Sequence, residues 1–113
     1  MGRASRDKGK RGERELAKEL TKLFGVAARR GQQFHGGPDS PDVVCDIPGI
    51  HWECKRTERL KLWEAICQAQ TDACSSGEVP VVCHRKNQQP WLITLQLEHL
   101  PAIVQILRHW IEE

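Results

Sequence analysis

Two carboxylates and a lysine lie close together in the middle of the chain, at Asp42, Glu53 and Lys55. This combination suits a hard divalent cation, because magnesium takes oxygen ligands and is usually held by one or two carboxylates together with substrate phosphates. A cation held in this way can activate a water molecule and neutralise charge on a phosphodiester. A lysine beside it can orient that water or stabilise the charge that develops. These three residues are therefore the first candidates for chemistry.

The segments that carry these residues, 42–47 and 50–55, are predicted to form a hairpin around Pro48-Gly49. Because side chains alternate across a strand, one face of this hairpin is apolar and the other is mostly ionisable. With a tight turn, the apolar face pairs Ile47 with Ile50, Cys45 with Trp52, and Val43 with Cys54. The opposite face then carries Asp42, Val44, Asp46, His51, Glu53 and Lys55.

Opposite and diagonal neighbours on such a face lie roughly 4.5–8 Å apart, so Asp42, Glu53 and Lys55 can converge on one patch. A two-residue Pro-Gly loop is not a favoured hairpin turn, but a loop longer by two residues keeps the same faces. An ordinary solvated strand face with an Asp–Lys cross-strand pair produces the same pattern. His51, on the ionisable face, is expected to be a surface histidine, with tuning of the site as the alternative. Trp52 and Trp63 are expected in the core.

A third acid, Glu13, comes from a predicted helix over residues 12–24. Glu13 lies three residues before Leu16 and seven before Leu20, so it continues the apolar stripe of this helix. A carboxylate on the core-facing side needs a partner. Alternatively, the first turn frays into water, or Glu13 only complements the helix dipole. Glu15, about 200° around the helix, is the alternative on the solvent side.

The remaining elements follow from periodicity and turn residues. A short strand is expected over residues 26–29 and a long polar loop over 30–41; loops of this length are often functional. A helix is expected over 60–74, strands over 79–84 and 91–95, and a helix over 100–111. Residues 1–10 are expected to form a flexible basic arm and 11–113 a single domain. This order predicts an α/β or α+β fold with a mixed sheet.

Composition excludes several classes of protein. The chain has 113 residues, of which 39% are hydrophobic and 28% charged, as in ordinary globular domains. No apolar run approaches the roughly 18 residues of a membrane span, and no signal-peptide pattern is present at the N-terminus. Five cysteines without a C-x-x-C pair favour a reduced, intracellular setting over disulfides or zinc. The formal net charge of +2 conceals a basic head, residues 1–30, on an acidic body, which suggests a polyanionic partner.

Three motifs together resemble the PD-(D/E)XK nuclease superfamily. They are the run Lys8-Gly-Lys-Arg-Gly-Glu-Arg-Glu-Leu16, the Pro41-Asp42-Val-Val segment, and Trp52-Glu53-Cys-Lys55. A lone E-x-K is weak, but an acid in the first helix, a P-D on one strand and E-x-K on the next form a fairly specific set. Within the superfamily, the chain resembles archaeal-type Holliday junction resolvases and their small phage relatives. The resemblance implies a restriction-endonuclease-like αβββαβ core with a mixed central sheet, here with an added C-terminal helix.

The resemblance also implies an activity. Glu13, Asp42 and Glu53 match the metal-binding acids and Lys55 the catalytic lysine. Gln68 falls where many members place a glutamine near the site, with Gln70 as the alternative. The implied function is a metal-dependent crossover-junction endonuclease that serves DNA recombination and repair. It works with Mg²⁺, or Mn²⁺ as a substitute, and without a small-molecule cofactor. A homodimer would nick four-way junctions symmetrically, each cut leaving a 5′-phosphate and a 3′-hydroxyl.

DNA binding is expected from basic and polar residues on both sides of the acidic patch. Each one alone is compatible with a simple solvated charge, but the set suits phosphate contacts, which are independent of base sequence. The candidates are Lys8, Lys10, Arg11, Arg29, Arg30, Gln32, Arg56 and Arg59. The alternatives are a nuclease acting on flaps, nicks or duplex DNA, or a non-catalytic DNA-binding accessory protein with the same fold. In either case the expected location is the cytoplasm of a bacterial, archaeal or phage-infected host cell.

Overall fold

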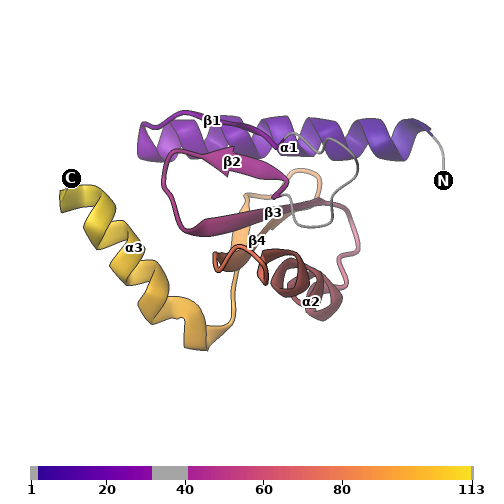
Figure 1. The fold of residues 1–113 in the computed structure, drawn as a ribbon. Coiled ribbons are helices and arrows are strands. Elements are labelled where there is room, and N and C mark those ends of the chain that lie inside the picture. The colour runs from indigo at the N-terminus through magenta and orange to yellow at the C-terminus, as the bar shows by residue number, and fades with distance from the viewer. Residues whose placement is uncertain (1–2, 32–40, 113) are drawn as a thin grey trace.

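The centre of the molecule is a five-stranded mixed sheet with the strand order β1-β2-β3-β4-β5 (Figure 1). The computed structural model describes residues 3–31 and 41–112, with side chains from residue 9 onward. The strands are β1 (Ala28–Arg30), β2 (Val43–Cys45), β3 (Ile50–Arg56), β4 (Val79–Arg85) and β5 (Leu92–Thr94). Only β3 and β4 pair in parallel, and the other neighbours are antiparallel. The α+β class with a mixed sheet that the sequence predicts is therefore confirmed.

Helices cover both faces of this sheet. The long helix α1 (Arg3–Phe24) packs on one face, and α2 (Leu62–Ala73), which connects the parallel strands β3 and β4, packs on the other (Figure 1). A parallel pair requires such a crossover, because its strands must enter from the same edge. The 3-10 turn Leu97–His99 leads into the last helix, α3 (Leu100–Glu112). None of the helices in the described part of the chain combines the length and apolar character needed to cross a membrane.

Alternation along β3 and β4 divides the core into two parts. Trp52 and Val81 point toward α1 and pack with its Leu16 and Leu20, whereas Val82 points toward α2. The side of the sheet under α1 holds the larger cluster, against which α3 also packs. Because successive side chains face opposite ways, the residues between the core positions of β3 must face α2. That set includes His51, Glu53 and Lys55.

The contact between α1 and β3 depends on Gly12. A Cβ atom placed on Gly12 would lie 2.7 Å from the Cβ of Arg56, too close for any ordinary contact. The absence of a side chain therefore lets the first part of α1 approach the end of β3. Glu13, the next residue, is brought to that end of the sheet as a result.

The hairpin differs from the predicted register by two residues. Val43 pairs with Trp52 rather than with Cys54, so the connection is longer than the expected two-residue turn. Gly49, with φ of 101°, takes a left-handed conformation in it. Since the side-chain period of a strand is two, this shift leaves the residues of both strands on their predicted faces.

Three other predictions are wrong. The first helix begins at Arg3 rather than near Gly12, so the segment expected to be a flexible arm is helical from that residue onward. Trp63 is 82% exposed and not part of the core, although Trp52 is buried as expected. His51 is not a surface residue: none of it is exposed, because α2 covers its face of the sheet.

Candidate active site

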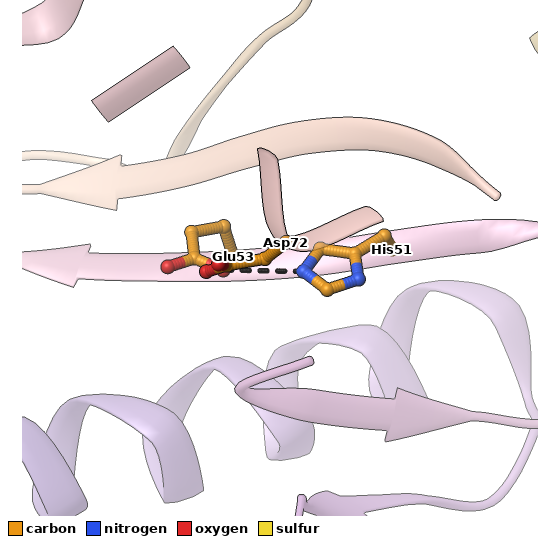
Figure 2. A group of neighbouring side chains, drawn as sticks. All are labelled: His51, Glu53 and Asp72. Carbon is orange, nitrogen blue, oxygen red and sulfur yellow. Dashed lines mark hydrogen bonds and ion pairs between the residues drawn. The ribbon is translucent and has the colours of Figure 1, made fainter. Parts of the chain in front are cut away.

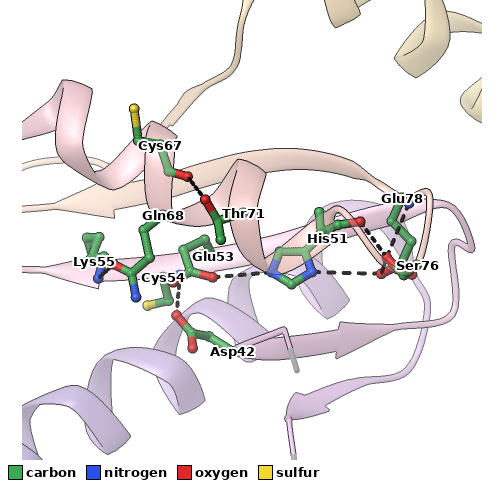
Figure 3. Close-up of polar contacts among 11 residues, drawn as sticks. Asp42, His51, Glu53, Cys54, Lys55, Cys67, Gln68, Thr71, Ser76 and Glu78 are labelled. Carbon is green, nitrogen blue, oxygen red and sulfur yellow. Dashed lines mark hydrogen bonds and ion pairs between the residues drawn. The ribbon is translucent and has the colours of Figure 1, made fainter. Parts of the chain in front are cut away.

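Asp42 is held beside β3 by two backbone contacts. Its own N–H donates to the carbonyl of Trp52 at 3.0 Å, and the N–H of Cys54 donates to its Oδ2 at 2.9 Å. The carboxylate therefore lies on the same edge of the hairpin as Glu53, which is only 2% exposed (Figure 3). The register of the hairpin thus brings the two acids together, as the alternation predicts.

The electrostatic surroundings of Asp42 show which charges converge on it. Burial, followed by the charge of Glu53, raises the pKa of Asp42 from 3.8 to about 7. Glu13 raises this pKa further, whereas Lys55 and the hydrogen bond from Cys54 lower it. Glu13, Asp42, Glu53 and Lys55 therefore share one site, and negative charge is in excess there. A bound divalent cation would relieve that excess, so the donor set fits the metal that the sequence suggests.

Glu13 reaches the site from α1 and is not frayed into water. Its Oε1 accepts a hydrogen bond from Nε of Arg30 on β1 at 2.8 Å, and its side chain is only 18% exposed. Glu15, the alternative, forms ion pairs with Arg56 and Arg85. Of these two acids, only Glu13 appears among the charges that raise the pKa of Asp42.

Lys55 is positioned by α2. Its Nζ donates to Oε1 of Gln68 at 3.0 Å (Figure 3). Gln70 lies about 200° further around the helix, so Gln68 is the glutamine at the site. The amide oxygen therefore holds the end of the Lys55 side chain in place, near the acids of the site.

Two polar residues at this site, His51 and Asp72, are absent from the set predicted from the sequence. His51 Nε2 lies 3.3 Å from Glu53 Oε1, and Asp72 on α2 lies next to both (Figure 2). Burial lowers the pKa of His51, but the hydrogen bond with Glu53 and the charges of Glu53, Glu78 and Asp72 outweigh it, so the pKa is raised. Alternation did place His51 on the acidic face, and the four-residue spacing of Gln68 and Asp72 puts them on one side of α2.

The basic candidates fall into three groups. Arg30 and Arg56 are engaged with acids of the protein, Glu13 for the first and Glu15 and Glu58 for the second. The side chains of four candidates are exposed, namely Lys10, Arg11, Arg29 and Arg59. The side chain of Lys8 and all of Gln32 lie outside the described residues.

A basic groove of about 590 Å³ runs between α1 and β1, beside the Arg30–Glu13 pair. Two of its basic side chains, Arg29 and Arg30, were predicted to contact DNA. The other two, Arg14 and Lys18, were not. Their four-residue spacing on one helix face is the signal that could have identified them.

Comparison with known proteins agrees with this geometry. Residues 4–112 match the model of a family described as "Phage putative PDDEXK endonuclease". The chain belongs to this family. The search of curated proteins finds no significant match.

A solved structure with the same architecture is that of Hjc from Archaeoglobus fulgidus, a Holliday junction resolvase from an archaeal hyperthermophile. The two sequences are 27% identical, the TM-score is 0.57, and the match covers 75% of this chain and 73% of the other. The resemblance to PD-(D/E)XK nucleases and the restriction-endonuclease-like fold are therefore confirmed. The protein is a PDDEXK-type nuclease that resembles Hjc in structure.

Proposed function

We propose that this nuclease is a metal-dependent, structure-selective DNA endonuclease that resolves four-way junctions as a homodimer. The observation that carries the catalytic part is the convergence of Glu13, Glu53 and Lys55 on Asp42, whose pKa is raised to about 7. Acids forced together in this way are costly to the fold unless a cation accompanies them. A non-catalytic DNA-binding protein would gain nothing from acids arranged in this way.

Each residue of the site has a role in this proposal. Asp42 and Glu53, with Glu13, hold the divalent cation, which when bound activates water and neutralises charge on the phosphodiester. The N–H of Cys54 keeps the Asp42 carboxylate turned toward the site. Lys55, held by Gln68, stabilises the negative charge that develops on the phosphate. Mg²⁺ suits the oxygen donors, and Mn²⁺ can substitute.

The groove between α1 and β1 is the proposed binding surface for the DNA backbone. Its four basic side chains, Arg14, Lys18, Arg29 and Arg30, supply positive charge next to Glu13. Contacts of Lys and Arg with phosphates give affinity that does not depend on base sequence. This is the type of binding that a structure-selective nuclease requires.

Two lines of support favour a homodimer that acts on junctions. The structural match is to a protein named as a Holliday junction resolvase, and a four-way junction offers two equivalent strands to two symmetric sites. In addition, β5 lies at an edge of the sheet and carries the exposed Leu92, and the exposed Trp63 and Leu97 line a groove together with Thr94 of β5. A second copy of the chain would remove this apolar surface from water.

The test compares a synthetic four-way junction, a flap and a linear duplex, each with and without Mg²⁺ or Mn²⁺. The proposal predicts paired, symmetric nicks in the junction only, and only with the metal. Asp42→Asn and Lys55→Ala should each abolish cleavage while junction binding in a gel-shift assay persists. Cutting of the flap or the duplex would show that the protein is one of the alternative nucleases and not a junction resolvase. Binding without any cutting would instead make the protein a DNA-binding accessory factor.

A further inference from the structure

The buried imidazole of His51 lies in a group of carboxylates on the α2 side of Glu53. The ligand atoms of His51, Glu53 and Asp72 all lie within 4.8 Å of one another (Figure 2). We propose that these three residues form a site for a divalent transition-metal ion of the Mn²⁺ type, on the opposite side of Glu53 from Asp42. The inference goes beyond the proposed function, because the site can bind a metal whatever DNA the protein cuts.

The spacing of the donors is close to what one ion requires. Two ligands at right angles, each about 2.1 Å from a metal, lie about 3 Å apart, and His51 Nε2 lies 3.3 Å from Glu53 Oε1. Opposite ligands lie about 4.2 Å apart at the same bond length. The separations in the group, at most 4.8 Å, therefore need only a small contraction. Asp72 lies on the partly exposed side of α2, so its side chain has room to move toward the other two ligands.

Glu78 provides a second, independent observation. Histidines that bind metals almost always donate their other ring N–H to a carboxylate or carbonyl, which holds the ring in place. His51 Nδ1 faces Oε1 of Glu78 at 3.8 Å, on the side away from Glu53 (Figure 3). This distance is slightly too long for a hydrogen bond, and the Glu78 side chain, which is 33% exposed, can move to close it. The imidazole thus lies between Glu78, whose carboxylate would orient it after this movement, and two carboxylates that would share the metal with it.

The charges of the group also call for a cation. Glu53, Asp72 and Glu78 surround His51, which is fully buried, as Glu53 almost is. Even a protonated imidazole compensates only one of the three carboxylates. A divalent ion compensates two, and the low polarity of the interior makes that compensation more valuable than it is in water.

The donor type predicts which metal binds. An imidazole nitrogen with two carboxylates suits Mn²⁺, Zn²⁺ and related ions, whereas Mg²⁺ prefers oxygen ligands and water. On the Asp42 side of Glu53, the described acids Asp42 and Glu13 supply oxygen donors, so the two sides should differ in preference. Glu53 joins them, since it contacts His51 on one side and raises the pKa of Asp42 on the other.

The test is electron paramagnetic resonance of Mn²⁺ bound to the full-length protein, which detects coupling of the metal to an imidazole ¹⁴N nucleus. The wild type should show this coupling, and His51→Gln should remove it. Asp72→Asn, on the partly exposed side of α2, should weaken binding of the nitrogen-coupled ion at least tenfold. Glu64→Gln, which removes an exposed carboxylate from the same helix, should change neither measurement.

Several results would overturn the proposal. They are the absence of ¹⁴N coupling in the wild type at saturating Mn²⁺, its persistence in His51→Gln, and an unchanged affinity in Asp72→Asn. Either of the first two results would leave the imidazole only as a hydrogen-bond partner of Glu53, and the third would show that Asp72 is not a ligand, so that the three-residue site does not exist. Asp42→Asn separates this inference from the proposed function. That variant should lose cleavage and keep the coupling, whereas a wild type that shows the coupling without cutting DNA would contradict only the nuclease proposal.

Discussion

Replacing Asp42 by asparagine should stabilise the metal-free protein above pH 5, although it removes a residue of the proposed active site. The pKa of Asp42 is raised from 3.8 to about 7 by burial and by the charges of Glu53 and Glu13. Between these two pH values the folded chain holds a proton at Asp42 that the unfolded chain has released. The free energy of unfolding therefore falls as pH rises through this window. Asparagine cannot ionise, and its side-chain oxygen can still accept the hydrogen bond from Cys54.

The magnitude follows from the size of the pKa shift. One pKa unit corresponds to about 1.4 kcal/mol, so a rise from 3.8 to about 7 corresponds to at most about 4 kcal/mol. Part of this energy belongs to the interactions of Asp42 with the charges of Glu53 and Glu13, and not to Asp42 alone. We therefore expect the difference in the free energy of unfolding between Asp42→Asn and the wild type to grow by about 2–4 kcal/mol from pH 4 to pH 8.

The assay is urea unfolding at pH 4, 5, 6, 7 and 8 with a chelator present, for the wild type, Asp42→Asn and Asp46→Asn. Asp46 is an exposed acid just after β2, so its variant controls for the loss of one charge from the hairpin. A stability difference between wild type and Asp42→Asn that does not grow with pH would refute the reasoning. Adding Mg²⁺ should reduce the difference, because the ion stabilises only the chain that binds it.

Three further variants test how the site is positioned. Gln68→Ala should reduce the cleavage rate at saturating DNA without weakening junction binding, because Gln68 orients Lys55; Gln70→Ala on the same helix should leave the rate unchanged. Lys18→Ala in the basic groove should weaken binding to junction and duplex alike, and the slope of log affinity against log salt concentration should become shallower by about one. Lys86→Ala, at an exposed position, should have a smaller effect. Gly12→Ala should lower both thermal stability and cleavage rate, because the close contact with β3 outweighs the roughly 1 kcal/mol of helix propensity that alanine adds; an unchanged melting temperature would contradict this account.

The order of the elements and the faces of the central hairpin could be predicted from the sequence. The β2–β3 register is wrong by two residues, yet Asp42 and Glu53 remain on one face, because the side-chain period of a strand is two. Helical periodicity likewise placed Glu13 on the stripe that turns toward the sheet. These periodicities are local properties of the chain, and they do not depend on contacts with the rest of the molecule.

The burial of the site and the choice among equivalent residues depended on the tertiary structure. Sequence spacing leaves Gln68 and Gln70 open, and the packing of α2 on β3 and β4 places Gln68 at Lys55. The same packing buries His51 completely, whereas an uncovered strand face would leave it in water. It also leaves Trp63 outside the core, although its residue type favours burial. The sequence by itself determined which side chains share a face, whereas only contacts between distant segments decided which faces are covered and which charges meet there.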